Sequence, residues 1–236
     1  MGVVYRARDS TLNRAVAVKV LKEGRLGTEL ARFRREVKAL LATAHPHVVK
    51  LLDAGEVEGR SFLVMELLPA GTLADVLVAA PRNRLPAARV AALADALLDA
   101  LEFAHAQGLV HRDIKPGNVM FDTAERPVLM DFGLAFDAGG EAITSAGYVV
   151  GTPQYLSPEA VRGEASAPAR DLWSVGVIAY ECLAGLPPFE GRDANEIARA
   201  VARCEPRPLG ELPPGRLIVR PSHAGFPSAI RRARTA

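Results

Sequence analysis

The chain has 236 residues, and 29 Lys and Arg against 27 Asp and Glu leave a formal net charge of +2. Hydrophobic residues make up 49% of the chain, which is enough to fill one large core or two small ones. This small charge does not indicate a nucleic-acid or anionic-membrane partner, and we expect neither nucleic-acid binding nor a membrane segment.

Cys182 and Cys204 lie far apart without a CxxC spacing, so a disulfide framework or a zinc site has little support. A reducing, cytoplasmic location is the default expectation. Acidic residues interrupt the longest apolar stretch, VAALADALLDALEFAHA, which is therefore predicted to be a helix of a water-soluble protein rather than a membrane span.

The first third of the chain is predicted to be mostly strand, with one helix. Alternation in RAVAVKVL places Val16, Val18 and Val20 on one face of a strand, while Lys19 shares the other face with the small Ala17. ELARFRREVKALL has helical spacing instead, with Glu36 at the edge of its apolar stripe. HVVKLLDAGEV and SFLVMEL read as two further strands around a Glu-Gly turn.

After Gly71 the pattern changes to helical periods. Helices are predicted in TLADVLVAA, from about 86 to 107 with Gly108 ending it, from about 169 to 184, and in DANEIARAVARC. Short strands flank HRDIKPGN and VLMDFG, and a long irregular stretch runs to Pro158. The predicted fold class is α+β with two lobes, a small antiparallel β lobe carrying one helix (1–68) and a larger helical lobe (69–204), followed by an irregular Pro/Arg-rich tail (205–236).

The loop HRDIKPGN gathers chemically useful side chains. Asp113, Lys115 and Asn118 place a carboxylate, an ammonium and an amide within six positions. HRD alone fits a solvated turn equally well. Three further elements favour a site: DFG at 131–133, AVK ending at Lys19, and Glu36 on the only predicted helix of the small lobe.

In this order the elements resemble the protein-kinase signature set, from residue 2 to about 204. GTPQYLSPE at 151–159 and DLWSVGV at 171–177 extend the resemblance. RFRRE, HRDIKPGN and GTPQYLSPE are most similar to the bacterial eukaryotic-type (Hanks-type) Ser/Thr protein kinases. The resemblance implies a two-lobed kinase fold and transfer of the ATP γ-phosphate to Ser and Thr hydroxyls of proteins, with ATP and Mg²⁺ as cofactors.

The resemblance also implies roles for individual residues. Asp113 would orient the substrate hydroxyl, Lys115 would neutralise charge on the γ-phosphate, and Thr152 would brace them both. Lys19 would hold the α and β phosphates while paired with Glu36, and Asn118 and Asp131 would hold Mg²⁺. The implied nucleotide-binding residues are Gly2, Val4, Ala17, Lys19, Met65, Glu66, Leu68, Met120 and Asp131. Methionines also fill gaps in ordinary cores, so Met65 and Met120 rest on the resemblance alone.

Regulation is implied by Arg112, which precedes the catalytic aspartate. In the resembled family an arginine there binds a phosphorylated residue of the following loop. Thr144 and Ser145 are the best placed acceptors for autophosphorylation, and Tyr148 is a poorer one.

The sequence departs from the family pattern at both ends. Only Gly2-Val3-Val4 remains of the phosphate loop GxGxxGxV, so we expect a kinase domain truncated at both ends, lacking its first strand and last helices. The segment after Pro208 lacks the DPxxR-type arginine that usually pairs with the glutamate at position 159, so Glu159 is expected to be an unpaired buried charge. The tail fits a disordered linker better than a basic segment for nucleic acid or lipid.

Two alternatives stay open. One is an inactive kinase fragment with residual nucleotide binding or a scaffold role. The other is a small-molecule phosphotransferase of the aminoglycoside type, against which GTPQYLSPE and Lys115 argue because these parts present a peptide.

Overall fold

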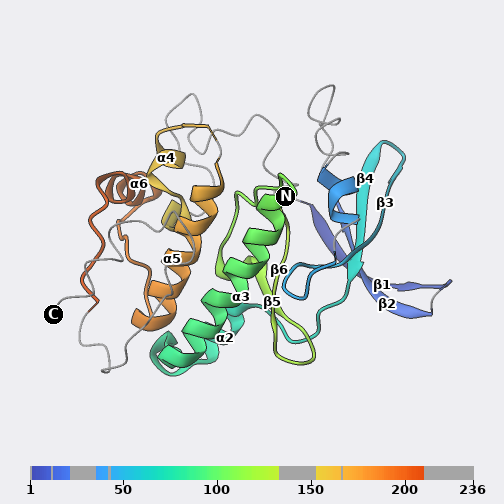
Figure 1. The fold of residues 1–236 in the computed structure, drawn as a ribbon, viewed down its shortest axis with the longest axis horizontal. Helices are drawn as coiled ribbons and strands as arrows, with labels where there is room; N and C mark the ends of the chain where they lie inside the picture. Colours follow the sequence, from blue (N-terminus) through green and yellow to red (C-terminus); the bar gives the residue numbers. More distant parts are fainter. Residues whose placement is uncertain are drawn as a thin grey trace.

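The computed structural model describes residues 2–11, 13–21, 36–41, 44–132, 153–165 and 167–209, and the statements below concern these ranges. A four-stranded antiparallel sheet is followed by a helical region, which confirms the predicted α+β class (Figure 1). The strands are β1 (Val3–Asp9), β2 (Arg14–Val20), β3 (Leu51–Val57) and β4 (Arg60–Glu66), in the spatial order β1-β2-β4-β3. Residues 36–41 are helical.

The register of the central strands brings the predicted β2 residues against β4. Ala17 lies opposite Met65 and Lys19 opposite Leu63. All four of these side chains are buried, so Lys19 leaves the sheet from an apolar surface. Glu58 and Gly59 join β3 to β4, with φ of 51° and 74°. Positive φ at both residues is what a two-residue hairpin turn of this kind requires.

The helical region starts after a short linker. Helix α2 (Leu73–Ala79) begins at the Thr72 cap, whose hydroxyl accepts a hydrogen bond from the backbone N–H of Asp75. The 3₁₀ turn η1 (Pro81–Asn83) leads to α3 (Ala87–Ala106). The predicted end of this helix is confirmed, because Gly108 follows it with φ of 73°.

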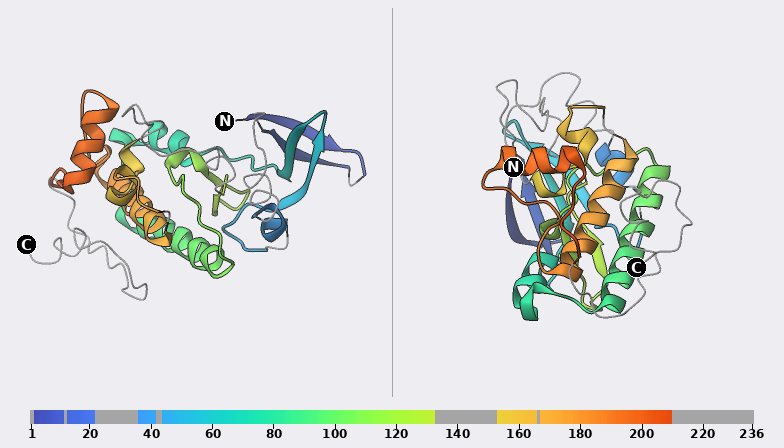
Figure 2. Two further views of the ribbon diagram at one scale, coloured as in Figure 1. Left: turned by 90° about the horizontal axis from the view of Figure 1, so that it is seen from above. Right: turned by 90° about the vertical axis from the view of Figure 1, so that its left-hand side faces the viewer.

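Helices α3 and α5 (Pro168–Ala184) carry the main core of the large lobe. Their fully buried side chains include Val90, Leu97, Leu101, Val175 and Ile178. Against α3 lies the two-stranded ladder of β5 (Val119–Phe121) and β6 (Pro127–Leu129), and the turn η2 (Pro116–Asn118) leads into it. Figure 2 shows the sheet at one end of the molecule and α4 (Pro158–Val161), α5 and α6 (Ala194–Arg203) at the other.

A second, smaller core lies under α4, α5 and α6. Trp173 stacks on Phe189 with ring centroids 5.8 Å apart, next to the buried Val201. The turn η3 (Pro153–Tyr155) also packs on this cluster. Among the helices that the structure describes, none has the length and apolar character needed to span a bilayer.

Candidate active site

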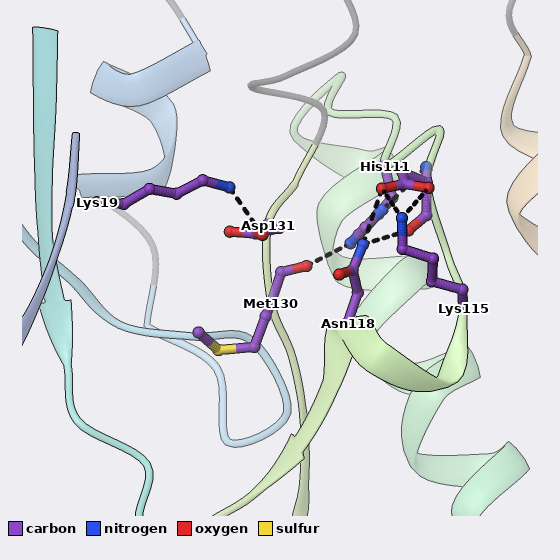
Figure 3. A network of polar contacts seen from close by, with 7 residues as sticks. Lys19, His111, Lys115, Asn118, Met130 and Asp131 are labelled. Carbon is purple, nitrogen blue, oxygen red and sulfur yellow. Dashed lines mark hydrogen bonds and ion pairs between the residues drawn. The ribbon is translucent and has the colours of Figure 1, made fainter. Parts of the chain in front are cut away.

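The loop between α3 and β5 brings three predicted site residues together. The ammonium of Lys115 lies 2.7 and 3.0 Å from the two carboxylate oxygens of Asp113. The amide nitrogen of Asn118 donates to the carbonyl oxygen of Asp113 at 2.7 Å and to its carboxylate at 3.0 Å (Figure 3). The side chain of Ile114, in the same loop, is buried in the main hydrophobic core. The carboxylate of Asp113 is therefore held in one orientation by two donors.

Asp171 in the first turn of α5 fixes this loop from inside the large lobe. Its carboxylate accepts hydrogen bonds from the backbone N–H groups of His111 (2.8 Å) and Arg112 (2.9 Å) and from the ring of His105 (2.8 Å). Asp171 is only 1% exposed, and a buried carboxylate is tolerated where such donors surround it. No motif in the sequence marked Asp171 as part of the site. The available signal was an acidic residue opening the apolar stretch DLWSVGV.

His111 connects the loop to the segment that carries Asp131. Its Nε2 lies 2.6 Å from the carbonyl oxygen of Met130, so that nitrogen carries the proton and donates, while Nδ1 accepts from the N–H of Asp113. The ring also packs on Phe132, with centroids 4.7 Å apart. Burial lowers the pKa of His111, which keeps the imidazole neutral.

Lys19 and Asp131 form an ion pair between the sheet and the large lobe. The ammonium lies 2.7 Å from the carboxylate, and the Lys19 side chain is only 6% exposed (Figure 3). Asp131 has φ of 60°, a left-handed conformation that is uncommon for residues other than glycine but that aspartate adopts more readily than most. Lys19, predicted to bind phosphate, thus forms an ion pair with Asp131, predicted to bind the metal.

The predicted ion pair of Lys19 with Glu36 is not formed in this structure. Among the described residues, Glu36 pairs instead with Arg112, whose Nη1 lies 3.4 Å from the Glu36 carboxylate. Two carboxylates and two cations meet here, and sequence spacing does not decide which cation each carboxylate contacts.

Most of the predicted nucleotide-binding residues lie on β2, β4 and β5 and in the stretch that follows β4. Ala17, Met65 and Leu68 are buried, and half-buried Met120 is bridged to Thr72 at the start of α2. Glu66 is fixed on both its polar groups, since its N–H donates to the Lys50 carbonyl at 3.1 Å and its carboxylate accepts from the Lys50 N–H at 2.8 Å.

Two further predicted nucleotide residues lie at the edge of the sheet. Val4 is 59% exposed and pairs in register with Lys19. Gly2 lies so close to β2 that an added Cβ would meet the Val20 carbonyl oxygen at 2.0 Å, so only glycine fits there. Thr144, Ser145, Tyr148 and Thr152 lie outside the described residues.

The segment that follows residue 152 is anchored on α5. The phenol of Tyr155 donates to the Glu181 carboxylate at 2.7 Å, and the Ser174 hydroxyl donates to the Tyr155 carbonyl oxygen at 2.8 Å. Burial raises the pKa of both Tyr155 and Glu181, so the phenol stays protonated and able to donate. Helix α5 therefore holds both this segment and the loop that contains Asp113.

The expectation that Glu159 is an unpaired buried charge is wrong. Its side chain is 47% exposed, and its carboxylate lies 3.9 Å from the guanidinium of Arg162, the C-cap residue of α4. The guanidinium of Arg170 binds the Glu159 carbonyl oxygen at 3.2 Å rather than its carboxylate. In the first turn of a four-residue helix, the carboxylate reaches solvent and needs no buried partner.

Comparison with known families agrees with this geometry. The model of the protein kinase domain matches residues 1–210. The chain belongs to this family. The match covers the sheet, the loop around Asp113 and helix α5, so the site described above is that of a kinase domain.

Curated relatives of this kinase domain include three proteins of Mycobacterium tuberculosis. The serine/threonine-protein kinase PknL is 42% identical over 83% of this chain and 49% of its own length. PknB is 38% identical over 88% of this chain and 34% of its own length, and PknA is 39% identical over 91% and 51%. The chain thus spans about half or less of the length of these relatives.

Proposed function

We propose that this kinase domain transfers the γ-phosphate of ATP to Ser and Thr hydroxyls of protein substrates. The observation that carries the proposal is the Asp113 carboxylate, held by Lys115 and Asn118 in a loop that Asp171 fixes from below. Phosphoryl transfer requires mainly positioning and charge neutralisation, which such a fixed constellation provides. The similar mycobacterial proteins named as serine/threonine-protein kinases support the choice of acceptor.

Asp113 orients the acceptor hydroxyl and receives its proton at the carboxylate. Lys115, already 2.7 Å from that carboxylate, neutralises charge on the transferred phosphoryl group. Thr152 is proposed to brace these two residues. Asp113 and Lys115 are thus the pair whose removal should abolish transfer without abolishing nucleotide binding.

The donor set around Asp131 and Asn118 fits Mg²⁺. The amide nitrogen of Asn118 is engaged with Asp113, which leaves its amide oxygen for a metal, and Asp131 supplies a carboxylate oxygen. These hard oxygen donors are the ligands that Mg²⁺ prefers, with phosphate oxygens and water completing its shell. When bound, the metal would neutralise phosphate charge during transfer.

The triphosphate and adenine are proposed to lie between the sheet and the large lobe. Lys19 binds the α and β phosphates and is positioned by Glu36, and Gly2 belongs to the remaining part of the phosphate loop. Val4 and Ala17 cover one face of the adenine and Met120 the other, Met65 is the gatekeeper, and the backbones of Glu66 and Leu68 supply the hydrogen bonds of the adenine. The buried, mainly apolar setting of Ala17, Met65 and Leu68 supports this placement.

Substrate and regulation complete the proposal. The segment of η3 and α4 would present the substrate peptide, since the contacts of Tyr155 with Glu181 and Ser174 hold it on α5. Thr144 and Ser145 are proposed as autophosphorylation sites that bind Arg112, and the protein is proposed to act in the cytoplasm.

Intact-mass spectrometry of the chain after incubation with Mg·ATP and a generic protein substrate tests the proposal. Mass gains of whole phosphates are expected on the wild type and on Asp99→Asn, an exposed acidic control, but not on Asp113→Asn. Peptide mapping locates any phosphate on Thr144 or Ser145. A folded wild type that binds Mg·ATP and transfers no phosphate would refute the proposed activity and favour an inactive fragment.

A further inference from the structure

Glu66, the last residue of β4, lies opposite Lys50, which immediately precedes β3. The register of the two strands pairs Leu51 with Met65, so Lys50 and Glu66 are the next opposed positions. The Glu66 N–H donates to the Lys50 carbonyl oxygen at 3.1 Å. Two directly opposed residues of an antiparallel pair that share one such bond normally share both. In a regular ladder, the Lys50 N–H would therefore return a bond to the Glu66 carbonyl oxygen.

The second bond goes to a side chain instead. The Lys50 N–H donates to the carboxylate of Glu66 at 2.8 Å. A backbone N–H has a single proton, and an ionised carboxylate is a stronger acceptor than a neutral carbonyl oxygen. The Glu66 side chain thus replaces the Glu66 carbonyl as the acceptor, and in this part of the described sheet the carbonyl oxygen lacks its bond from Lys50.

The Glu66 carbonyl oxygen has a use in the proposed function, on which this inference rests. There the backbone of Glu66 supplies a hydrogen bond to the adenine. A carbonyl oxygen can only accept, so its partner must be a donor, and the exocyclic amino group at C6 is the donor that adenine offers. A bond from Lys50 would take one of the two lone pairs of this oxygen and fix the carbonyl in the direction of β3.

We propose that Glu66 acts through its side chain as a positioning residue for the adenine. By accepting the Lys50 N–H, the carboxylate keeps the backbone carbonyl of Glu66 available to the C6 amino group. Without this carboxylate, the Lys50 N–H would turn to the Glu66 carbonyl oxygen, because a backbone donor within a sheet costs free energy while it is unpaired. The resulting loss of affinity is restricted to nucleotides that carry the C6 amino group.

The test compares two nucleotides that differ only at this amino group. Titration calorimetry on the whole chain gives the Kd of Mg·ATP and of the magnesium complex of purine riboside triphosphate, in which hydrogen replaces the amino group. The wild type is expected to bind ATP about three- to ten-fold more tightly, as the net strength of one hydrogen bond implies. Glu66→Met keeps the length of the side chain without an oxygen, and should bind the two nucleotides within about twofold of each other. Glu66→Gln, whose amide oxygen still accepts, should keep most of the wild-type ratio.

Asp53→Ala is the matched control. The Asp53 carboxylate also accepts a backbone N–H within β3, that of Ala54 at 2.8 Å, and its side chain is exposed, so its removal should leave the ratio of the two Kd values unchanged. A purely structural role of Glu66 would weaken the binding of both nucleotides equally and would not move this ratio either.

Two results would overturn the positioning role while leaving the proposed phosphoryl transfer intact. One is a folded Glu66→Met protein that keeps the wild-type ratio of Kd values. The other is a wild type that binds both nucleotides with equal affinity, and this result counts whether or not the variants fold. A wild type that binds neither nucleotide would overturn the positioning role and the proposed function together.

Discussion

Replacing Asp171 with asparagine tests whether α5 holds the catalytic loop. The change keeps the shape of the side chain and converts a carboxylate that accepts three hydrogen bonds into an amide with one accepting and one donating end. One oxygen accepts from the His111 N–H and the His105 ring, and the other from the Arg112 N–H. The amide nitrogen must therefore face at least one N–H group, and it cannot accept a hydrogen bond from that group.

The cost follows from this geometry. At least one buried N–H loses its acceptor, which costs ~1–3 kcal/mol, and the remaining bonds lose the roughly twofold strengthening that an ionised acceptor gives. We expect the free energy of unfolding to fall by about 3 kcal/mol, a large part of the ~5–15 kcal/mol typical of a folded domain. The phosphoryl-transfer rate should fall as well, because Asp113 follows the two anchored residues directly.

Urea unfolding followed by circular dichroism measures the stability change, and a single-turnover assay measures the rate. Asp99→Asn is the matched control, since this carboxylate also contacts a histidine, His45 at 3.3 Å, but is 60% exposed. It should cost less than ~1 kcal/mol. If Asp171→Asn unfolds at the same urea concentration as this control and transfers phosphate at the wild-type rate, the anchoring role is wrong.

Three further predictions can be checked independently. Burial lowers the pKa of His111 below its ordinary value of 6.5, so below that pH the unfolded chain takes up a proton that the folded chain does not. The free energy of unfolding, measured by urea titration, should therefore fall as the pH drops below about 6.5, by up to ~1.4 kcal/mol per pH unit. In His111→Gln it should fall less steeply. Gly185→Ala should lower the Tm more than Gly108→Ala does. Both glycines have positive φ, but of the two only Gly185 would bring an added Cβ onto a backbone oxygen, that of Arg82 at 2.3 Å. Equal decreases in Tm would contradict this prediction. Lys115→Met should lower kcat by about 10²-fold or more with the Kd of Mg·ATP changed little, as stopped-flow and titration would show, and a parallel loss of binding would contradict the assigned role.

The sequence predicted much of this protein because the relevant signals are local. Alternation indicated the strand β2, the Glu-Gly pair indicated the hairpin between β3 and β4, and Gly108 indicated the end of α3. Backbone preferences and side-chain periodicity act over a few residues, so they can be recognised without knowledge of the fold. Asp113, Lys115 and Asn118 could be grouped for the same reason, since they lie within one loop.

Tertiary structure alone decided which distant charges meet. Asp171 lies 60 positions from the His111 N–H that it binds, Glu36 contacts Arg112 rather than Lys19, and the Glu159 carboxylate reaches solvent. Ion pairs depend on distance and burial, and both are set by how the lobes and helices pack rather than by spacing along the chain. The amino-acid sequence by itself therefore determined which chemical groups the site contains, while packing determined which of them are paired.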